Sequence, residues 1–303
     1  MTALPAAPVG RPLIGIAIVA FAVMNFALGD TLTKALTERF PVPAIIAARF
    51  WINFVLLVIF LGPRHGARLW RTTRTWLVVL RGLILAMGSL SMGFALRLIP
   101  VGEATSLVYL APIVVILLST PILGERPTRV SVAGAAVGFC GVLLIARPGS
   151  GLNPEGVLWA LTGVVVTAFY HLTTRLLART ETAVSMQFYS ALVGALVFTP
   201  LSLAGPAVPM PDGLDLARLM GVGVAMTAGH YLFTLAYREA PATLIAPFTY
   251  LQLLWAVMLG WLVFGHVPDW ISTAGIALIA GSGAAIAATG HMMSRRVPPP
   301  PAG

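Results

Sequence analysis

The sequence predicts an all-α membrane protein whose ten transmembrane helices form two inverted five-helix repeats. Of the 303 residues, 58% are hydrophobic and 10% are charged, and the mean hydropathy is +0.92, which excludes a soluble fold. The hydrophobic residues form ten runs, each close to the about 20 residues that a helix needs to cross a bilayer. The second half of the chain also repeats the pattern of the first half.

Proline, glycine and charged residues separate the ten hydrophobic runs and define the expected helices. These runs lie near residues 12–37, 42–62, 76–98, 101–123, 129–146, 155–177, 184–203, 216–237, 241–264 and 270–290. Each is expected to be helical, because hydrocarbon offers no hydrogen-bond partner to a free backbone amide. Pro100 and Pro241 mark tight hairpins between the third and fourth and between the eighth and ninth helices. Ten spans use about 200 residues and leave no room for a separate catalytic or binding domain.

The basic residues predict the orientation in the membrane, because positively charged loops tend to stay in the cytoplasm. Twelve of the 19 Lys and Arg residues lie at the end of the bundle that carries the N-terminus, five lie at the other end, and Arg49 and Arg81 lie within or at the edge of spans. Both termini are therefore expected to be cytoplasmic, and residues 291–303 are expected to form a disordered tail. The net charge of +9 does not indicate a nucleic-acid partner, since the basic residues are scattered singly among apolar runs.

A shift of the chain by 141 residues reveals an internal duplication. Without a gap, twelve of the forty-two positions between residues 95 and 136 match their partners, among them Tyr109 and Tyr250. Hydrophobic composition alone does not account for matched tyrosine, proline, arginine and glycine positions. Because each half holds an odd number of helices, the two halves cross the membrane in opposite directions. The expected repeats cover residues 13–148 and 153–290.

Both repeats contain the same pattern of loop residues, a hairpin proline (Pro100 or Pro241) followed later by a Gly-x-x-Pro sequence. The first repeat has Gly-Glu-Arg-Pro at 124–127, and the second has Gly-His-Val-Pro at 265–268. Over residues 13–290 this pattern resembles the EamA repeats of the drug/metabolite transporter superfamily, and more weakly the YddG-type exporters of aromatic and other neutral amino acids. The resemblance implies a transporter of the bacterial inner membrane. His266 stands where many relatives carry glutamate, so any role of that carboxylate is confined to Glu125.

Polar and aromatic side chains within the spans are the candidates for a substrate cavity. Polar groups deep in a bilayer are costly and usually face the protein interior or water, and aromatic rings supply the apolar walls of ligand sites. Two alternatives stay open. The polar groups could serve a purely structural purpose, joining helices by hydrogen bonds worth about 0.6 kcal/mol each, and the aromatic rings could lie in the core or face lipid. The expected cavity residues are Asn25, Ser91, Tyr109, Tyr170, His230, Tyr250, Gln252 and Trp255.

Asp30 and Arg49 are the candidates for an ion pair at a gate. They lie at matching distances from the turn between the first two helices, so an antiparallel hairpin brings them to the same depth. The pair has two interpretations, a structural staple whose loss would strand a buried charge, and a gate. The 141-residue shift places His171 opposite Asp30, where it could couple a proton to gating or only hydrogen-bond a neighbouring helix.

Prolines and glycines within the spans are candidate hinges. Pro112 and Pro247 remove a backbone donor from the fourth and ninth helices. They are not equivalent under the shift, so one side of the protein could open more readily, although a kink that only serves packing is the simpler explanation. Gly88 and Gly229 permit close helix contact and bending.

Absences limit the chemistry. No acidic residue, Lys or Arg lies at a span centre, which favours a neutral or zwitterionic solute over an organic cation or a phosphorylated compound. The sequence lacks a nucleotide-binding Gly-rich Lys-Ser/Thr loop, which excludes direct ATP hydrolysis. The single cysteine, Cys140, excludes an intrachain disulfide. No cofactor and no metal are expected, because the five histidines are dispersed.

The resemblance implies export of neutral or aromatic amino acids and related small metabolites by alternating access through a central cavity between the repeats. Proton antiport and facilitated diffusion both remain open as coupling modes. A passive channel and a membrane-embedded enzyme are the alternatives from other classes. The expected partners are the small-molecule substrate and the lipid bilayer, and the protein is expected to be a monomer without an obligate protein partner.

Overall fold

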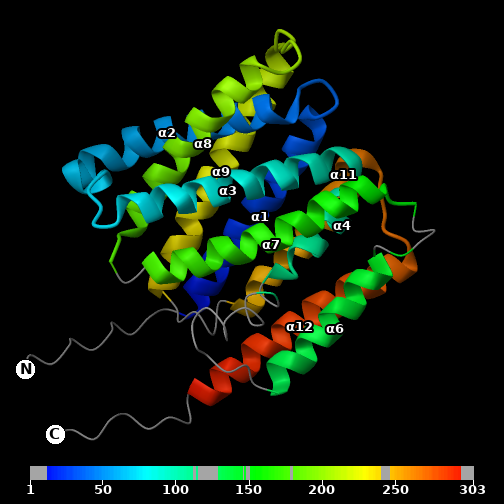
Figure 1. Ribbon diagram of the computed structural model, residues 1–303. Coiled ribbons are helices and arrows are strands. Elements are labelled where there is room, and N and C mark those ends of the chain that lie inside the picture. The colour runs from blue at the N-terminus through cyan, green and yellow to red at the C-terminus, as the bar shows by residue number, and fades with distance from the viewer. Residues whose placement is uncertain are drawn as a thin grey trace, which may run out of the picture.

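The computed structural model describes residues 12–111, 114, 129–145, 147, 151–177, 180–239 and 246–294. These residues form ten α-helices and two short 3-10 helices and contain no strand, which confirms the expected fold class (Figure 1). The elements are α1 (Pro12–Leu36), α2 (Val42–His65), η1 (Gly66–Leu69), α3 (Thr75–Leu98), α4 (Val101–Val108), α6 (Arg129–Ile145), α7 (Pro154–Leu177), α8 (Ala183–Leu203), α9 (Gly213–Glu239), η2 (Ala246–Tyr250), α11 (Leu251–Phe264) and α12 (Trp270–Ser294).

Local sequence signals account for the helix ends. Helix α2 begins directly after Pro41, whose fixed φ suits a helix start. Helix α8 begins after Thr182, whose hydroxyl accepts a hydrogen bond from the backbone N–H of Ser185. Helix α11 ends at Gly265, which has a φ of 67° and closes the helix in the left-handed conformation that glycine adopts without strain.

The fourth and ninth helices differ from the sequence prediction. Helix α4 ends at Val108, although the hydrophobic run continues to residue 123. The ninth run is divided into η2 and α11, and Pro247 lies within η2. Pro112 lies outside the described residues, as do the Gly-Glu-Arg-Pro loop and the hairpin proline of the second repeat.

Five of the described helices are long and apolar enough to cross a membrane, and three shorter helices are also apolar. The long segments are Leu13–Leu36, Val42–Leu69, Thr75–Leu98, Pro154–Thr174 and Ala183–Leu203, and the short ones are Val132–Ile145, Phe248–Phe264 and Trp270–Ala285. Large hydrophobic side chains such as Phe60 and Leu203 are exposed on the outside of the bundle. A lipid-facing surface requires such side chains.

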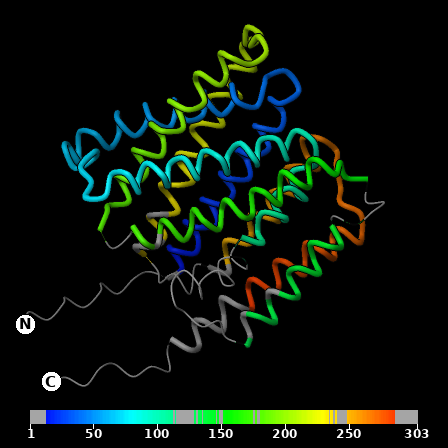
Figure 2. The backbone as a smooth tube through the Cα atoms, in the orientation of Figure 1, coloured from blue at the N-terminus to red at the C-terminus, as the bar shows by residue number. Residues whose placement is uncertain are grey.

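The packing of the helices follows the internal duplication. Helix α1 packs on α9 as its counterpart α7 packs on α3, and α1 contacts α11 as α7 contacts α4. The counterparts α2 and α8 pack on each other, and so do α6 and α12. The two halves therefore interleave instead of forming separate lobes, and segments with early and late colours lie side by side in the bundle (Figure 2). This arrangement is that of inverted repeats related by a two-fold axis.

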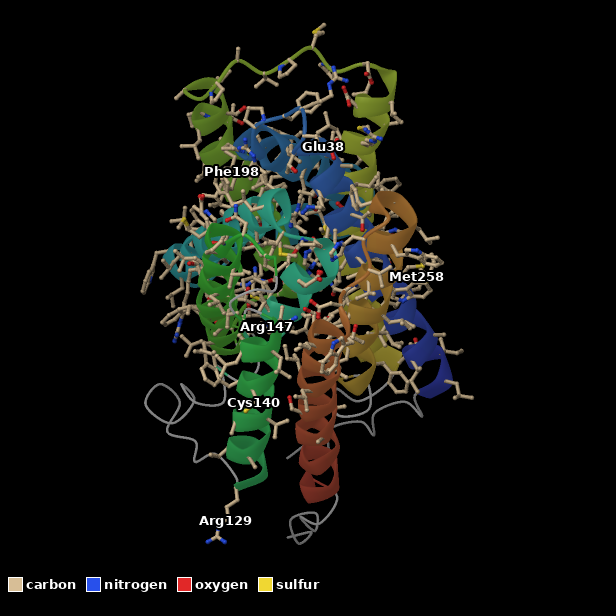
Figure 3. All side chains as sticks on the ribbon, turned by 90° about the vertical axis from the view of Figure 1, so that its right-hand side faces the viewer. Glu38, Arg129, Cys140, Arg147, Phe198 and Met258 are labelled. Carbon is tan, nitrogen blue, oxygen red and sulfur yellow. The ribbon has the colours of Figure 1, made fainter. Side chains whose placement is uncertain are left out.

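Helices α6 and α12 form a pair at one edge of the bundle (Figures 1 and 3). Arg147 marks the end of the pair near the other helices, and Arg129 marks the far end (Figure 3). The two helices cross closely at Gly141 and Gly275, because a Cβ atom on Gly141 would lie 2.7 Å from the carbonyl oxygen of Gly275. Only glycine at this crossing permits the contact.

Candidate substrate cavity

A cavity of about 230 Å³ lies between the two repeats. Its walls come from α1, α2, α3 and α4 of the first repeat and from α7, α9 and α11 of the second. The lining residues are Phe26, Asp30, Arg49, Ile84, Leu85, Gly88, Ser89, Met92, Thr105, Val108, Tyr109, Val166, Thr167, Tyr170, His171, Met226, His230 and Gln252. A site of this kind, apolar with a few polar groups and shared between repeats, is the usual form of a transporter substrate site.

Eight of the residues expected from the sequence meet in this cavity. Four of the expected cavity residues line it, together with all three gate residues and one of the expected hinges. They are Asp30, Arg49, Gly88, Tyr109, Tyr170, His171, His230 and Gln252. The functions expected for them remain predictions, but the structure brings them to one place from six helices and from the C-terminal end of a seventh, α4.

A chain of hydrogen bonds crosses the cavity from α4 to α11 and α1. The hydroxyl oxygen of Tyr109 lies 2.8 Å from the carbonyl oxygen of Thr249 and 3.0 Å from Oε1 of Gln252. The amide Nε2 of Gln252 donates to Oδ2 of Asp30 at 3.5 Å. Gln252 therefore connects the buried carboxylate of the first repeat to the second repeat, and a buried polar chain of this kind holds its members in fixed orientations.

The direct ion pair between Asp30 and Arg49 is a prediction that the structure does not bear out. Both side chains line the cavity and interact electrostatically. Among the described contacts, however, no nitrogen of Arg49 lies within 4.0 Å of an oxygen of Asp30, and Nε of Arg49 is buried without a hydrogen-bond partner. Equal depth along the helices does not ensure contact, because the direction of a side chain around the helix axis is set by packing.

Arg81 is a buried charge whose role the sequence analysis did not identify. Its side chain is 4% exposed, and its guanidinium donates to Oγ1 of Thr174 at 2.7 Å, Oγ of Ser190 at 2.8 Å and the hydroxyl of Tyr170 at 2.6 Å. It also lies 4.5 Å from the centroid of the Tyr170 ring. An arginine within a span was the available signal. Arg81 fixes the position of a ring that lines the cavity.

His230 and Phe26 form a further part of the cavity wall. Their rings pack edge to face with centroids 4.9 Å apart. Phe26 also packs against Gly229, where a Cβ atom would lie 2.6 Å from the Phe26 ring. Gly229 thus leaves room for an aromatic ring of α1, and its use as a hinge remains a prediction.

Four other expected cavity residues lie outside the cavity lining. Asn25 donates to the carbonyl oxygen of Phe21 in its own helix at 2.8 Å. Ser91 is 1% exposed and faces α7, since a Cβ atom on Gly163 would lie 3.7 Å from the Cβ of Ser91. The ring of Tyr250 packs against that of Tyr109 in a tilted arrangement with centroids 5.2 Å apart, and its hydroxyl fits against Gly283 of α12.

Trp255 completes the set of expected residues outside the lining. It packs against two hydrophobic clusters of the core, and its Nε1 is buried without a hydrogen-bond partner among the described residues. The surrounding apolar side chains make Trp255 part of the core, which is the alternative that the sequence left open.

Two polar contacts between the repeats lie at opposite ends of the bundle. At the end with the α1–α2 turn, which the sequence predicts to face outward and which we term the predicted outer end, Arg39 pairs with Asp212 at 2.6 Å and also with Asp215. The backbone N–H of Asp215 and the Arg39 guanidinium hold the pKa of Asp212 below its ordinary value.

At the opposite end, Glu181 accepts hydrogen bonds from the α2–α3 loop. Its Oε1 accepts from the hydroxyl of Thr73 at 2.6 Å and from the backbone N–H of Arg74 at 2.7 Å. Burial raises the pKa of the Glu181 carboxyl, but these hydrogen bonds outweigh that effect and lower its pKa. The 141-residue shift places Asp215 opposite Arg74, so related loops join the repeats at both ends with the charges reversed.

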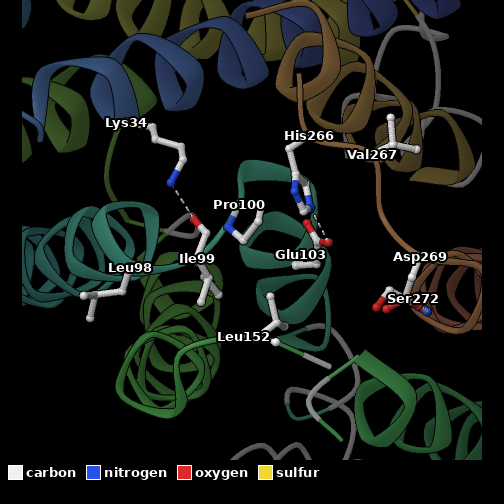
Figure 4. A pocket seen from close by; sticks show the side chains of 11 residues that line it. Lys34, Leu98, Ile99, Pro100, Glu103, Leu152, His266, Val267, Asp269 and Ser272 are labelled. Carbon is white, nitrogen blue, oxygen red and sulfur yellow. Dashed lines mark hydrogen bonds and ion pairs between the residues drawn. The ribbon is translucent and has the colours of Figure 1, made fainter. Parts of the chain in front are cut away.

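A second cavity of about 490 Å³ opens at the predicted outer end (Figure 4). It is lined by Lys34, Leu98, Ile99, Pro100, Glu103, Gly151, Leu152, His266, Val267, Asp269 and Ser272. Within the part of the chain that the structure describes, no group of three or more His, Cys, Asp or Glu side chains is arranged to hold a metal ion.

Comparisons with known proteins agree with this architecture. A model of the EamA-like transporter family matches residues 13–147 and again residues 154–288. The chain is 30% identical over 277 residues to a riboflavin transporter of Rhizobium johnstonii, with 89% of each chain covered, and 27% identical to an S-adenosylmethionine uptake transporter of Rickettsia felis, with 85% and 86% covered. A crystal structure with 23% identity superposes with a TM-score of 0.65 over 94% of this chain and 98% of that chain, which supports the fold.

Proposed function

Because the chain belongs to the EamA-like transporter family and is a multi-pass membrane transporter of small molecules, we propose that its substrate joins an α-amino-acid group to a flat ring. Aromatic amino acids are such compounds, and so is S-adenosylmethionine, the compound named for one relative. The named relatives broaden the expectation of amino-acid export, since their names refer to a vitamin and a nucleoside-bearing amino acid.

The observation that carries this proposal is the presence of opposite charges in one aromatic cavity. Asp30 offers a carboxylate for an ammonium group, and Arg49 has a buried Nε without a described partner that suits a carboxylate. The rings of Phe26, Tyr109 and Tyr170 supply flat apolar walls. An amino acid is a zwitterion, so this proposal keeps the expectation of a neutral or zwitterionic substrate, and charged groups nearer the span ends reach the cavity.

The cavity volume favours the smaller members of this class. The cavity volume of about 230 Å³ is smaller than the volume of about 300–1,000 Å³ that is usual for pockets of drug-sized ligands. An aromatic amino acid suits this volume better than a flavin does. The inverted repeats support alternating access, in which the cavity opens to one side and then to the other as the repeats move relative to each other. Export is the direction that we propose, and the uptake named for the relative is the alternative.

A counterflow assay in proteoliposomes tests the substrate class and separates a carrier from a passive channel. Tryptophan, phenylalanine, S-adenosylmethionine and riboflavin are compared, with leucine as an amino acid without a ring. We expect saturable counterflow of at least one compound that has both an amino-acid group and a ring. Transport of riboflavin alone, without competition by any amino acid, would overturn the proposal. Linear, non-saturable flux would instead indicate a channel.

Variants of the two charged residues test the recognition itself. D30N and R49Q should lower the apparent affinity for the zwitterionic substrate by about 10- to 100-fold, because a charge-assisted hydrogen bond contributes about 1.5–3 kcal/mol. The methyl ester of the amino acid keeps the ammonium group but lacks the carboxylate, so D30N should transport this ester less well than the parent protein does. The parent protein should prefer the free acid to the ester, and R49Q should lose this preference. The control is R97Q, which removes an exposed arginine at the end of α3. If the parent protein transports the free acid and the methyl ester equally well, the proposed role of Arg49 in binding the substrate carboxylate is refuted.

A further inference from the structure

Glu103 and His266 form a contact between the repeats in the wall of the 490 Å³ cavity. Nε2 of His266 lies 2.9 Å from Oε1 of Glu103 (Figure 4). The Glu103 side chain is 3% exposed, whereas that of His266 is 39% exposed. The second carboxylate oxygen of Glu103, Oε2, is buried and has no hydrogen-bond partner among the described residues. One oxygen of this buried carboxylate thus contacts a histidine, and the other oxygen has no described hydrogen-bond partner.

Helix ends hold both residues in place. Glu103 lies in the first turn of α4, where the helix dipole favours a negative charge. His266 follows Gly265, and its backbone N–H closes α11 on the carbonyl oxygen of Gly260 at 3.4 Å. The contact therefore joins the start of α4 in the first repeat to the end of α11 in the second.

The same two helices carry lining residues of the substrate cavity. Thr105 and Tyr109 belong to α4 and its C-cap, and Gln252 belongs to α11. The helices pack closely, since a Cβ atom on Gly102 would lie 2.9 Å from the side chain of Val257. Separation of α4 and α11 at the predicted outer end would break the contact between Glu103 and His266.

The residues that correspond to Glu103 and His266 in the other repeat cannot form the same contact with each other. Under the 141-residue shift, Glu103 corresponds to Leu244 and His266 corresponds to Glu125. A leucine and a glutamate cannot form such a pair. The pair of Glu103 and His266 is therefore not repeated by the internal duplication of the sequence.

Other charged groups surround the pair. Lys34 of α1 donates to the carbonyl oxygens of Leu96 at 2.7 Å and Ile99 at 2.9 Å and interacts electrostatically with Glu103 (Figure 4). From the α11–α12 loop comes Asp269, whose charge is balanced by Arg147 at 2.9 Å.

We propose that Glu103 and His266 form a proton-binding latch that holds the predicted outer end of the transport path closed. An imidazolium donates a charge-assisted hydrogen bond to the carboxylate, and a neutral imidazole forms a weaker one. Binding of a proton to the imidazole of His266 therefore strengthens the latch, and loss of that proton weakens it. The latch goes beyond the proposed function and does not depend on the identity of the substrate.

Thiol labelling measures the opening without a substrate. A reporter cysteine replaces Ser89, which lines the substrate cavity, in a C140S background that removes the chain's single cysteine. Maleimide labels the purified protein between pH 5.5 and 8.0, and each rate is divided by that of the unfolded protein to remove the pH dependence of the thiol. We expect the normalised rate to rise about tenfold with pH, which corresponds to about 1.4 kcal/mol.

H266Q is the decisive variant, because glutamine keeps an amide donor but does not gain a proton. It should label at the high rate at every pH, whereas the control H65Q, which changes a histidine at the opposite end, should keep the rise. A rise in H266Q equal to that of the reporter protein would overturn the proposal, as would a reporter protein whose rate does not vary with pH. If H266Q is not recovered as a folded protein, E103Q provides the same test, with the exposed Glu38 changed to glutamine as its control.

Discussion

Replacement of Tyr170 by phenylalanine should destabilise the protein by about 1.5–3 kcal/mol, because it removes the acceptor of a charged hydrogen bond inside the bundle. The hydroxyl of Tyr170 accepts from Nη2 of Arg81 at 2.6 Å, and Arg81 is 4% exposed, so water cannot easily replace the lost acceptor. Phenylalanine keeps the ring 4.5 Å from the guanidinium, so the cation–π interaction persists and the hydrogen bond alone is measured.

A double-mutant cycle with R81M, Y170F and the combined variant isolates this interaction. Reversible unfolding in mixed micelles with increasing dodecyl sulfate, followed by circular dichroism, supplies the free energies of unfolding. The control is Y189F, which removes a neutral hydrogen bond of 3.0 Å from Tyr189 to the carbonyl oxygen of Trp70 near the surface. A coupling energy below about 0.5 kcal/mol, or a cost of Y170F no larger than that of Y189F, would refute the view that Arg81 positions the ring.

Two further predictions concern the contacts between helices. Because the pKa of Glu181 is lowered in the folded protein, E181Q should be less stable than the parent protein at pH 7. In thermal unfolding, this difference in stability should shrink as the pH falls below the ordinary carboxyl pKa of 4.5. A difference that grows toward low pH would contradict the prediction. G141V should weaken the α6–α12 crossing by about 1–3 kcal/mol, since the added Cβ would meet the backbone of Gly275, whereas G281A, which meets no atom within 4 Å, should be close to neutral in the same measurement.

Much of the site could be predicted from the sequence because bilayers make intramembrane polar residues rare. Asp30, His171 and Gln252 were candidates on this ground alone, and all three line the cavity. The sequence did not single out Glu103, because it lies at a helix start, where the helix dipole commonly favours a carboxylate for structural reasons. Its importance follows from His266, which lies far away in the sequence and reaches it only in the folded protein.

The amino-acid sequence by itself determined the all-α fold, the helix boundaries to within a few residues in most cases, and the inverted duplication. Lipid permits little besides helices, and an odd number of spans per repeat leaves one relative orientation. Only the tertiary structure decided which side chains meet. Residue counting gives the depth of a group along a helix at 1.5 Å per residue, but its direction around the axis depends on how the helices pack. For this reason Asp30 and Arg49 share a cavity without forming an ion pair, while Ser91 is buried outside the cavity lining and Trp255 packs against the hydrophobic core.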